Sequence, residues 1–101
     1  MSEIWTHHQK TVNGFRMHYV TAGSGYPLVL LHGWPQSWYE WRGIIPALAE
    51  HFTIIAPDLR GLGDSEKPMT GYDKRTMASD VRALVDQLGY AQVGVIGHDW
   101  G

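Results

Sequence analysis

The sequence contains no cysteine, carries little net charge and has no long apolar run. Without cysteine the chain has no disulfide framework and no thiolate chemistry. A net charge of −2, with no cluster of lysine and arginine, argues against a face that binds nucleic acid. No apolar stretch reaches the length of a membrane span, and the N-terminus lacks the basic-then-apolar pattern of a secretion signal. We therefore expect a cytoplasmic protein that binds neither nucleic acid nor a membrane.

The residues that are present are sufficient for a packed core. Hydrophobic residues make up 44% of the 101 positions and aromatic residues 12%, which argues against a disordered chain. The length suits one small domain or a piece of a larger one.

Three apolar runs and one turn signal predict the strands of a sheet. Asn13-Gly14 lies between two strand-like runs and accepts the positive backbone angles of a tight hairpin turn, which predicts an antiparallel pair. The apolar runs at 28–31, 52–56 and 92–96 are typical of buried strands.

Two segments between these strands have helical patterns. Ser37 and Glu40 have the spacing of a capping box, and the helix that they begin is broken or restarted at Pro46. Residues 73–88 carry one apolar stripe at helical spacing, and Gly89 closes that helix. A hairpin followed by alternating strands and helices predicts an α/β fold with a mainly parallel sheet.

The chain ends on Gly97-His98-Asp99-Trp100-Gly101, directly after the strand predicted at 92–96. This is the frame Gly-x-nucleophile-x-Gly, which places one reactive side chain on a sharp turn between a strand and a helix. The glycines are needed because the backbone folds too tightly there for larger side chains. Many hydrolases carry serine at the central position, which Asp99 occupies here.

An aspartate in this frame changes the chemistry. Its carboxylate is already ionised at neutral pH, so it can attack a saturated carbon without the help of a base. The attack leaves an alkyl ester on the enzyme, and water must then attack the carbonyl carbon of that ester. The second step needs a general base and an oxyanion hole.

A second motif, His32-Gly33-Trp34-Pro35, follows the apolar run at 28–31. Gly33 permits a close backbone approach and Pro35 fixes the turn, which leaves the Trp34 N–H free to point at a ligand. Both motifs follow strands of one parallel sheet, so both reach the edge beyond the carboxyl ends of the strands, where ligands bind.

With a third segment, residues 58–65, these motifs carry a resemblance to a known family. From about Trp5 to Gly101 the sequence is similar to the N-terminal part of the epoxide hydrolase branch of the α/β-hydrolase superfamily. Residues 32–35 match the branch's His-Gly-x-Pro motif, residues 61–65 its Gly-x-small-x-Ser/Thr motif, and residues 97–101 its aspartate elbow.

The resemblance implies a role for each motif residue. Asp99 is the nucleophile, and the backbone N–H groups of Trp34 and Trp100 form the oxyanion hole. The remaining motif residues support the two turns: His32, Gly33, Pro35, Gly97, His98 and Gly101. In the family, two cap-domain tyrosines protonate the epoxide oxygen, and a later acid and histidine activate water. Because all of these follow the elbow, residues 1–101 are expected to be a single incomplete core domain, the N-terminal half of the sheet, without the cap and the C-terminal part.

No histidine of this sequence is expected to be the catalytic base. Neighbours at such a turn point apart, which separates His98 from Asp99, and His32 is expected to tie down its loop by hydrogen bonds. The other histidines are expected on the surface or on strand faces: His7, His8, His18 and His51.

The loop with Asp58, Asp64 and Ser65 is expected to be structural, because these side chains suit hydrogen bonds that shape a loop. Gly61-Leu62-Gly63 is no dinucleotide fingerprint, since Glu66 holds the place of the third glycine. No histidine pair has helical metal-ligand spacing beside a third candidate ligand. The sequence therefore predicts neither a cofactor nor a metal ion.

Epoxide hydrolysis is the leading hypothesis, and dehalogenation by the same attack is the alternative. The Trp100 indole N–H can hold a halide, as in haloalkane dehalogenases. Trp34, however, lacks the amide or carboxylate that those enzymes usually carry, and haloacetate dehalogenases typically place arginine at the position of Trp100. Ester hydrolysis is a weaker possibility because Asp99 replaces serine.

A non-catalytic alternative is an inactive fragment. The isolated 101 residues are expected to be inactive and to fold poorly, because the strand before the elbow would lack a partner at its far edge. In the catalytic hypotheses the partners are water and a small epoxide or organohalide. Oligomeric state cannot be read from the sequence.

Overall fold

The computed structural model describes residues 5–31, 41–61, 63, 65–67 and 74–97. It contains five strands and two helices within those residues. In chain order they are β1 (Thr6–Val12), β2 (Phe15–Ala22), β3 (Tyr26–Leu31), α1 (Ile45–Leu48), β4 (Phe52–Pro57), α2 (Lys74–Gln87) and β5 (Gly94–Gly97).

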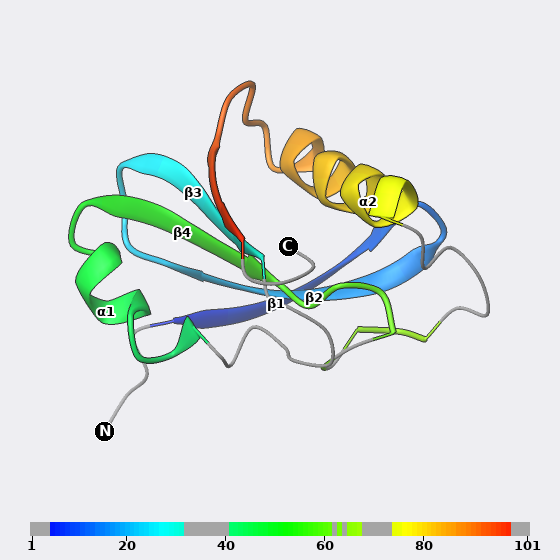
Figure 1. The fold of residues 1–101 in the computed structure, drawn as a ribbon, viewed down its shortest axis with the longest axis horizontal. Coiled ribbons are helices and arrows are strands. Elements are labelled where there is room, and N and C mark those ends of the chain that lie inside the picture. Colours follow the sequence, from blue (N-terminus) through cyan, green and yellow to red (C-terminus); the bar gives the residue numbers. More distant parts are fainter. Residues whose placement is uncertain (1–4, 32–40, 62, 64, 68–73, 98–101) are drawn as a thin grey trace.

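The strands form one mixed sheet in the order β1-β2-β4-β3-β5 (Figure 1). β2 is antiparallel to both of its neighbours, β1 and β4, whereas β4, β3 and β5 run parallel. α1 connects β3 to β4 and α2 connects β4 to β5, because consecutive parallel strands need a crossover connection. The predicted α/β architecture, a hairpin followed by parallel strands alternating with helices, is confirmed.

The hairpin turn is formed by the two residues that the sequence singles out. Asn13 and Gly14 have φ values of 48° and 84°, the left-handed region that a two-residue hairpin turn requires. Val12 and Phe15 are the last partners of the β1–β2 ladder. The turn and the antiparallel pair predicted from Asn-Gly are therefore confirmed.

Both helices are found where the pattern predicts them. α1 begins at Ile45 with Pro46 in its first turn, which confirms the predicted restart, while Ser37 and Glu40 lie outside the described residues. α2 covers the predicted helical segment from Lys74, and Gly89 follows it with a φ of 89°. No helix in the described part of the chain is long and apolar enough to cross a membrane.

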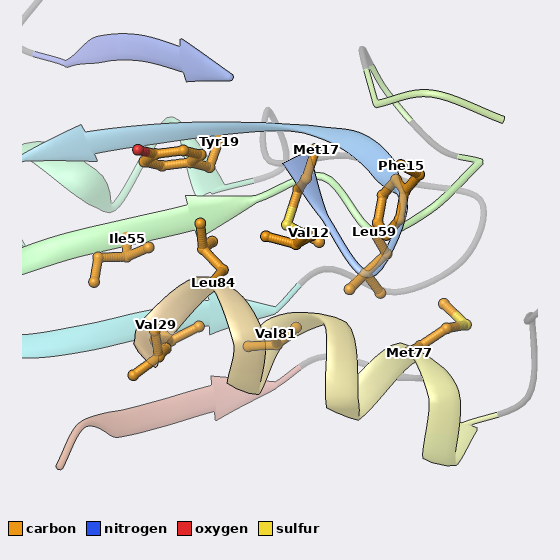
Figure 2. Packing of buried hydrophobic residues seen from close by; sticks show 11 residues of the cluster. Val12, Phe15, Met17, Tyr19, Val29, Ile55, Leu59, Met77, Val81 and Leu84 are labelled. Atoms are coloured by element: carbon orange, nitrogen blue, oxygen red, sulfur yellow. The ribbon is translucent and has the colours of Figure 1, made fainter. Parts of the chain in front are cut away.

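Two apolar clusters pack against opposite faces of the sheet. Figure 2 shows the larger one, in which Met77, Val81 and Leu84 of α2 lie against side chains of the hairpin and of the central strands. The smaller cluster joins Ile45 of α1 to the other face. In β3, Val29 belongs to the first cluster, whereas Leu28 and Leu30 belong to the second. The prediction that this apolar run is covered on both faces is confirmed.

β5 is less buried than its apolar run predicts, and it has the unpartnered far edge expected for these 101 residues. The strand spans Gly94–Gly97 rather than 92–96, and Val95 and Ile96 are 56% and 37% exposed. β5 pairs with β3 on one side only and stands at the edge of the sheet formed by the described residues. An apolar sequence shows that a strand can be buried, but the burial itself depends on what lies beside the strand.

Two glycines allow a stability test with a matched control. Gly14 and Gly23 both have positive φ, at 84° and 75°. A Cβ atom at Gly23 would overlap the backbone carbonyl oxygens of Ala49 and Phe52, whereas a Cβ atom at Gly14 meets nothing within 4 Å. We expect Gly23→Ala to be more destabilising than Gly14→Ala by about 1–3 kcal/mol, because only the former adds overpacking to the conformational cost. The free energies of unfolding of both variants, measured in urea on the complete protein, give this difference. Equal unfolding midpoints would contradict the prediction.

Candidate active site

Three parallel strands end together at one edge of the sheet. Leu31, the last residue of β3, is the Cα partner of Gly97, the last residue of β5. The β3–β4 ladder runs as far as Val29 and Ile55, and each strand continues two residues beyond it, to Leu31 and to Pro57. Ligands of parallel α/β sheets bind at this edge, beyond the carboxyl ends of the strands.

Both motif turns begin at this edge. His32 follows Leu31 and His98 follows Gly97, so the chain enters the two turns from paired positions on neighbouring strands. Gly97 is exposed at the end of β5. The other predicted site residues lie outside the described part of the chain: His32, Gly33, Trp34, Pro35, His98, Asp99, Trp100 and Gly101.

A buried polar network lies just beyond the end of β4. Asp58 is the first residue after the strand and is fully buried, and its Oδ2 lies 2.8 Å from His18 Nδ1 on β2. The Ser65 hydroxyl donates to the Asp58 carbonyl oxygen at 2.6 Å and accepts the His18 backbone N–H at 2.9 Å. The loop-shaping roles predicted for Asp58 and Ser65 are confirmed, while Asp64 lies outside the described residues.

His18 differs from a surface histidine, although it does lie on a strand face. Its exposed fraction is 4%, and the hydrogen bond to a buried carboxylate offsets part of the cost of that burial. Its Nε2 lies 3.0 Å from Nδ1 of the exposed His7 on β1, and the two rings stack with centroids 5.2 Å apart. The sequence feature that could have indicated the burial of His18 is its place between Met17 and Tyr19, within a strand that is buried on both faces.

The neighbouring histidine of the hairpin is engaged on the opposite face. His8 Nε2 lies 2.8 Å from the Thr21 hydroxyl, and the imidazole stacks on the Tyr19 ring at 4.9 Å. Burial raises the pKa of the Tyr19 phenol above its ordinary value, so the phenol stays neutral at physiological pH. Within the described ranges, no three histidine, aspartate or glutamate side chains are grouped so that they could hold a metal ion.

A buried ion pair between Arg60 and Asp80 was not singled out in the sequence. Arg60 Nε and Nη2 donate to the two carboxylate oxygens of Asp80 at 2.6 and 2.7 Å, and Asn13 Nδ2 donates to the same carboxylate at 2.9 Å. The guanidinium also lies over the Phe15 ring, 4.7 Å from its centroid. The pair ties α2 to the loop after β4 and to the hairpin turn. The sequence feature that could have indicated this ion pair is an aspartate within the apolar stripe of α2, between Met77 and Val81.

A groove of about 580 Å³ runs between α2 and the strands β3 and β5. Its lining is mostly apolar, with Val81, Val85, Val93 and Val95 among the contributing residues, and Arg82 and Asp86 on the helix side. It extends along β3 from Tyr26 to Leu31 on the helix-covered face. The two motif turns start from the strand ends instead, so we do not assign this groove to the substrate.

Comparison with known proteins identifies the family. Residues 26–101 match the family profile described as alpha/beta hydrolase fold, and residues 2–41 match the profile of the epoxide hydrolase N terminus. The chain is 82% identical over all its 101 residues to the soluble epoxide hydrolase of Corynebacterium sp. (strain C12), of which it covers 35%. It is 43% identical over 94 residues to epoxide hydrolase 2 of Siraitia grosvenorii, of which it covers 30%.

Solved structures agree with these sequence relatives. Epoxide hydrolase CorEH without ligand superposes with a TM-score of 0.95 at 84% identity, over 96% of this chain and 34% of that one. An epoxide hydrolase from Vigna radiata gives a TM-score of 0.92 at 42% identity, over 97% of this chain and 33% of that one.

The chain thus belongs to the alpha/beta hydrolase fold family, within its epoxide hydrolase branch. It spans about a third of the length of the relatives that it matches.

Proposed function

We propose that the protein containing this chain hydrolyses epoxides to vicinal diols, with Asp99 as the nucleophile. The observation that carries the proposal is the pairing of Leu31 with Gly97. Because these residues are Cα partners, the His-Gly-Trp-Pro turn and the aspartate elbow start side by side at the edge where such sheets bind ligands. The relatives named above are epoxide hydrolases, which supports the same activity.

The first step is alkylation of the enzyme. A carboxylate oxygen of Asp99 attacks one carbon of the epoxide ring, the C–O bond to that carbon breaks, and an ester forms between Asp99 and the substrate. The opened oxygen takes a proton from an acid of the enzyme, and the family resemblance assigns this acid to cap tyrosines that follow the elbow.

The second step is hydrolysis of that ester. Water gives a proton to a general base and attacks the carbonyl carbon of the Asp99 ester, which creates a tetrahedral oxyanion. The backbone N–H groups of Trp34 and Trp100 stabilise this oxyanion, and each such donor contributes roughly 3–4 kcal/mol in other hydrolases. Collapse of the intermediate expels the alkoxide oxygen of the substrate, which takes the proton from the protonated base and leaves as the diol. The proton of the Asp99 carboxyl group returns to the acid that was deprotonated in the first step, which restores the carboxylate.

The remaining motif residues hold the two turns in shape. Gly33 and Pro35 set the backbone of the oxyanion turn, while Gly97 and Gly101 allow the tight elbow. His32 and His98 complete the two motifs as supporting residues rather than as bases. Under this proposal residues 1–101 form part of one core domain, the partners are an epoxide and water, and the protein works in the cytoplasm.

The product separates epoxide hydrolysis from dehalogenation. Incubating the protein with styrene oxide and a panel of other epoxides is expected to yield vicinal diols, measured by chromatography. A parallel panel of haloalkanes and haloacetate, assayed for halide, is expected to give none. Halide release without diol formation would overturn the proposal in favour of dehalogenation.

A further inference from the structure

The hairpin brings two histidine side chains together on one face of the sheet. In the β1–β2 ladder the Cα partner of His18 is Gln9, which lies two residues from His7 on β1. His7 and His18 are therefore diagonal neighbours on the same face, within reach of ring side chains. His7 Nδ1 lies 3.0 Å from His18 Nε2, so two imidazole nitrogens from neighbouring strands meet at one point.

The buried member of this pair is already oriented as a metal ligand would be. His18 is buried, and its Nδ1 lies 2.8 Å from Oδ2 of the fully buried Asp58. Because a carboxylate only accepts, Nδ1 carries the proton, and the lone pair of the neutral ring is on Nε2, the nitrogen that faces His7. Metal-binding histidines almost always donate their other ring N–H to a partner of this kind, which fixes the tautomer and the direction of the ring.

The distance between the two nitrogens suits one metal ion. Histidine nitrogens bind ions such as Zn²⁺ at about 2.0–2.1 Å, so two of them on one ion stand about 2.8–3.4 Å apart for angles between square and tetrahedral. The observed separation of 3.0 Å lies within this range. His7 is exposed, so an ion reaches the pair from that side, and the His7 ring can turn to direct the lone pair of Nδ1 at the ion.

From this geometry we propose that His7 and His18 bind a divalent transition-metal ion, with Asp58 as the outer partner of His18 and water in the remaining positions. Imidazole nitrogens suit Cu²⁺, Ni²⁺ and Zn²⁺, and Cu²⁺ binds most tightly among them. The ion replaces the proton between the two rings, and His7 then carries its proton on Nε2. Helical spacing in the sequence does not reveal this pair, because its members lie across two strands. The proposal is independent of the proposed function.

Calorimetric titration of the complete, tag-free protein with Cu²⁺ tests the proposal. The tightest site is expected to hold one ion, and electron paramagnetic resonance of the loaded protein should show coupling to two imidazole nitrogens. His7→Ala should lower the affinity by more than about 100-fold, because it removes a ligand, whereas loss of an outer partner costs about 10- to 100-fold. His7 is exposed, so this variant should fold like the wild type, which far-UV circular dichroism checks.

His8→Ala is the matched control. His8 is the next residue of β1 but turns to the other face, where its Nε2 lies 2.8 Å from the Thr21 hydroxyl. This variant should bind Cu²⁺ with the affinity of the wild type. Wild-type affinity in His7→Ala, or an equal loss of affinity in His8→Ala, would overturn the proposal.

Asp58→Asn tests the outer partner. It removes the carboxylate that holds His18, and the folded variant should bind Cu²⁺ about 10- to 100-fold more weakly. Asp80→Asn makes the same change in another fully buried carboxylate, whose partner is Arg60, and should leave the affinity of the folded protein unchanged. Wild-type affinity in folded Asp58→Asn, or equal weakening in Asp80→Asn, would overturn the role of Asp58.

Discussion

Replacing Asp99 with alanine is expected to reduce epoxide turnover by about 10⁴-fold or more, because single deletions of a catalytic nucleophile have effects of this size. Alanine has no oxygen that can attack the epoxide, so neither the ester nor its hydrolysis can occur. The effect should fall on kcat, because the change removes the attacking group itself. Diol formation under saturating substrate measures it.

The control for this variant is an aspartate far from the strand ends. Asp86→Ala removes an exposed carboxylate on α2, whose contact is a 3.7 Å ion pair with Arg82, and turnover should remain at the wild-type level. The unfolding midpoint of Asp99→Ala is expected to match that of the wild type, which would separate a loss of chemistry from a loss of fold. Full activity in Asp99→Ala would show that the nucleophile is another residue.

Replacing Asp80 with alanine is expected to be the most destabilising of these changes, by about 3–5 kcal/mol, because it leaves a buried guanidinium without its carboxylate. Arg60 is 6% exposed and Asp80 fully buried, and both carboxylate oxygens are engaged. The loss also removes the 2.9 Å hydrogen bond of the Asn13 amide in the hairpin turn, which keeps its 3.3 Å contact with the Ser79 hydroxyl. Natural domains have free energies of unfolding of only about 5–15 kcal/mol, so a loss of this size is a large fraction of the total stability. The free energy of unfolding in urea measures it.

The control for Asp80→Ala is a second aspartate on the same helix, α2. Asp86→Ala makes the same chemical change six residues further along, at an exposed position, and should stay within about 0.5 kcal/mol of the wild type. Helix propensity gains equally at both positions, so the difference between the two variants isolates the buried pair. Equal effects in Asp80→Ala and Asp86→Ala would contradict the account of this ion pair.

The fold was largely predictable because its signals are local. Asn13-Gly14 determines a hairpin turn through the backbone angles that these two residues tolerate. The apolar stripe of α2 and the apolar run of β3 each reflect one element that packs against the sheet. Alternating strands and helices allow few sheet topologies, because consecutive parallel strands must be connected by a crossover. The observed sheet is one of these topologies.

The burial of β5 was not predictable from its residues. Val95 and Ile96 suit a buried strand, yet both are exposed, because β5 has no second neighbouring strand among the described residues. The pairings of His18 with Asp58 and of Arg60 with Asp80 join residues 40 and 20 positions apart. Propensity and periodicity are local and carry no information on such partners. The placement of Asp99 stays a prediction from the motif.

The central claim is that Asp99 forms a covalent ester, and oxygen labelling tests it most directly. In a single turnover in H₂¹⁸O, the diol should contain only unlabelled oxygen, because its new oxygen comes from the Asp99 carboxylate. The water oxygen should remain on the enzyme, and mass spectrometry should find ¹⁸O in the peptide that contains Asp99. A labelled diol together with an unlabelled peptide would mean that water attacks the epoxide directly, which contradicts the account.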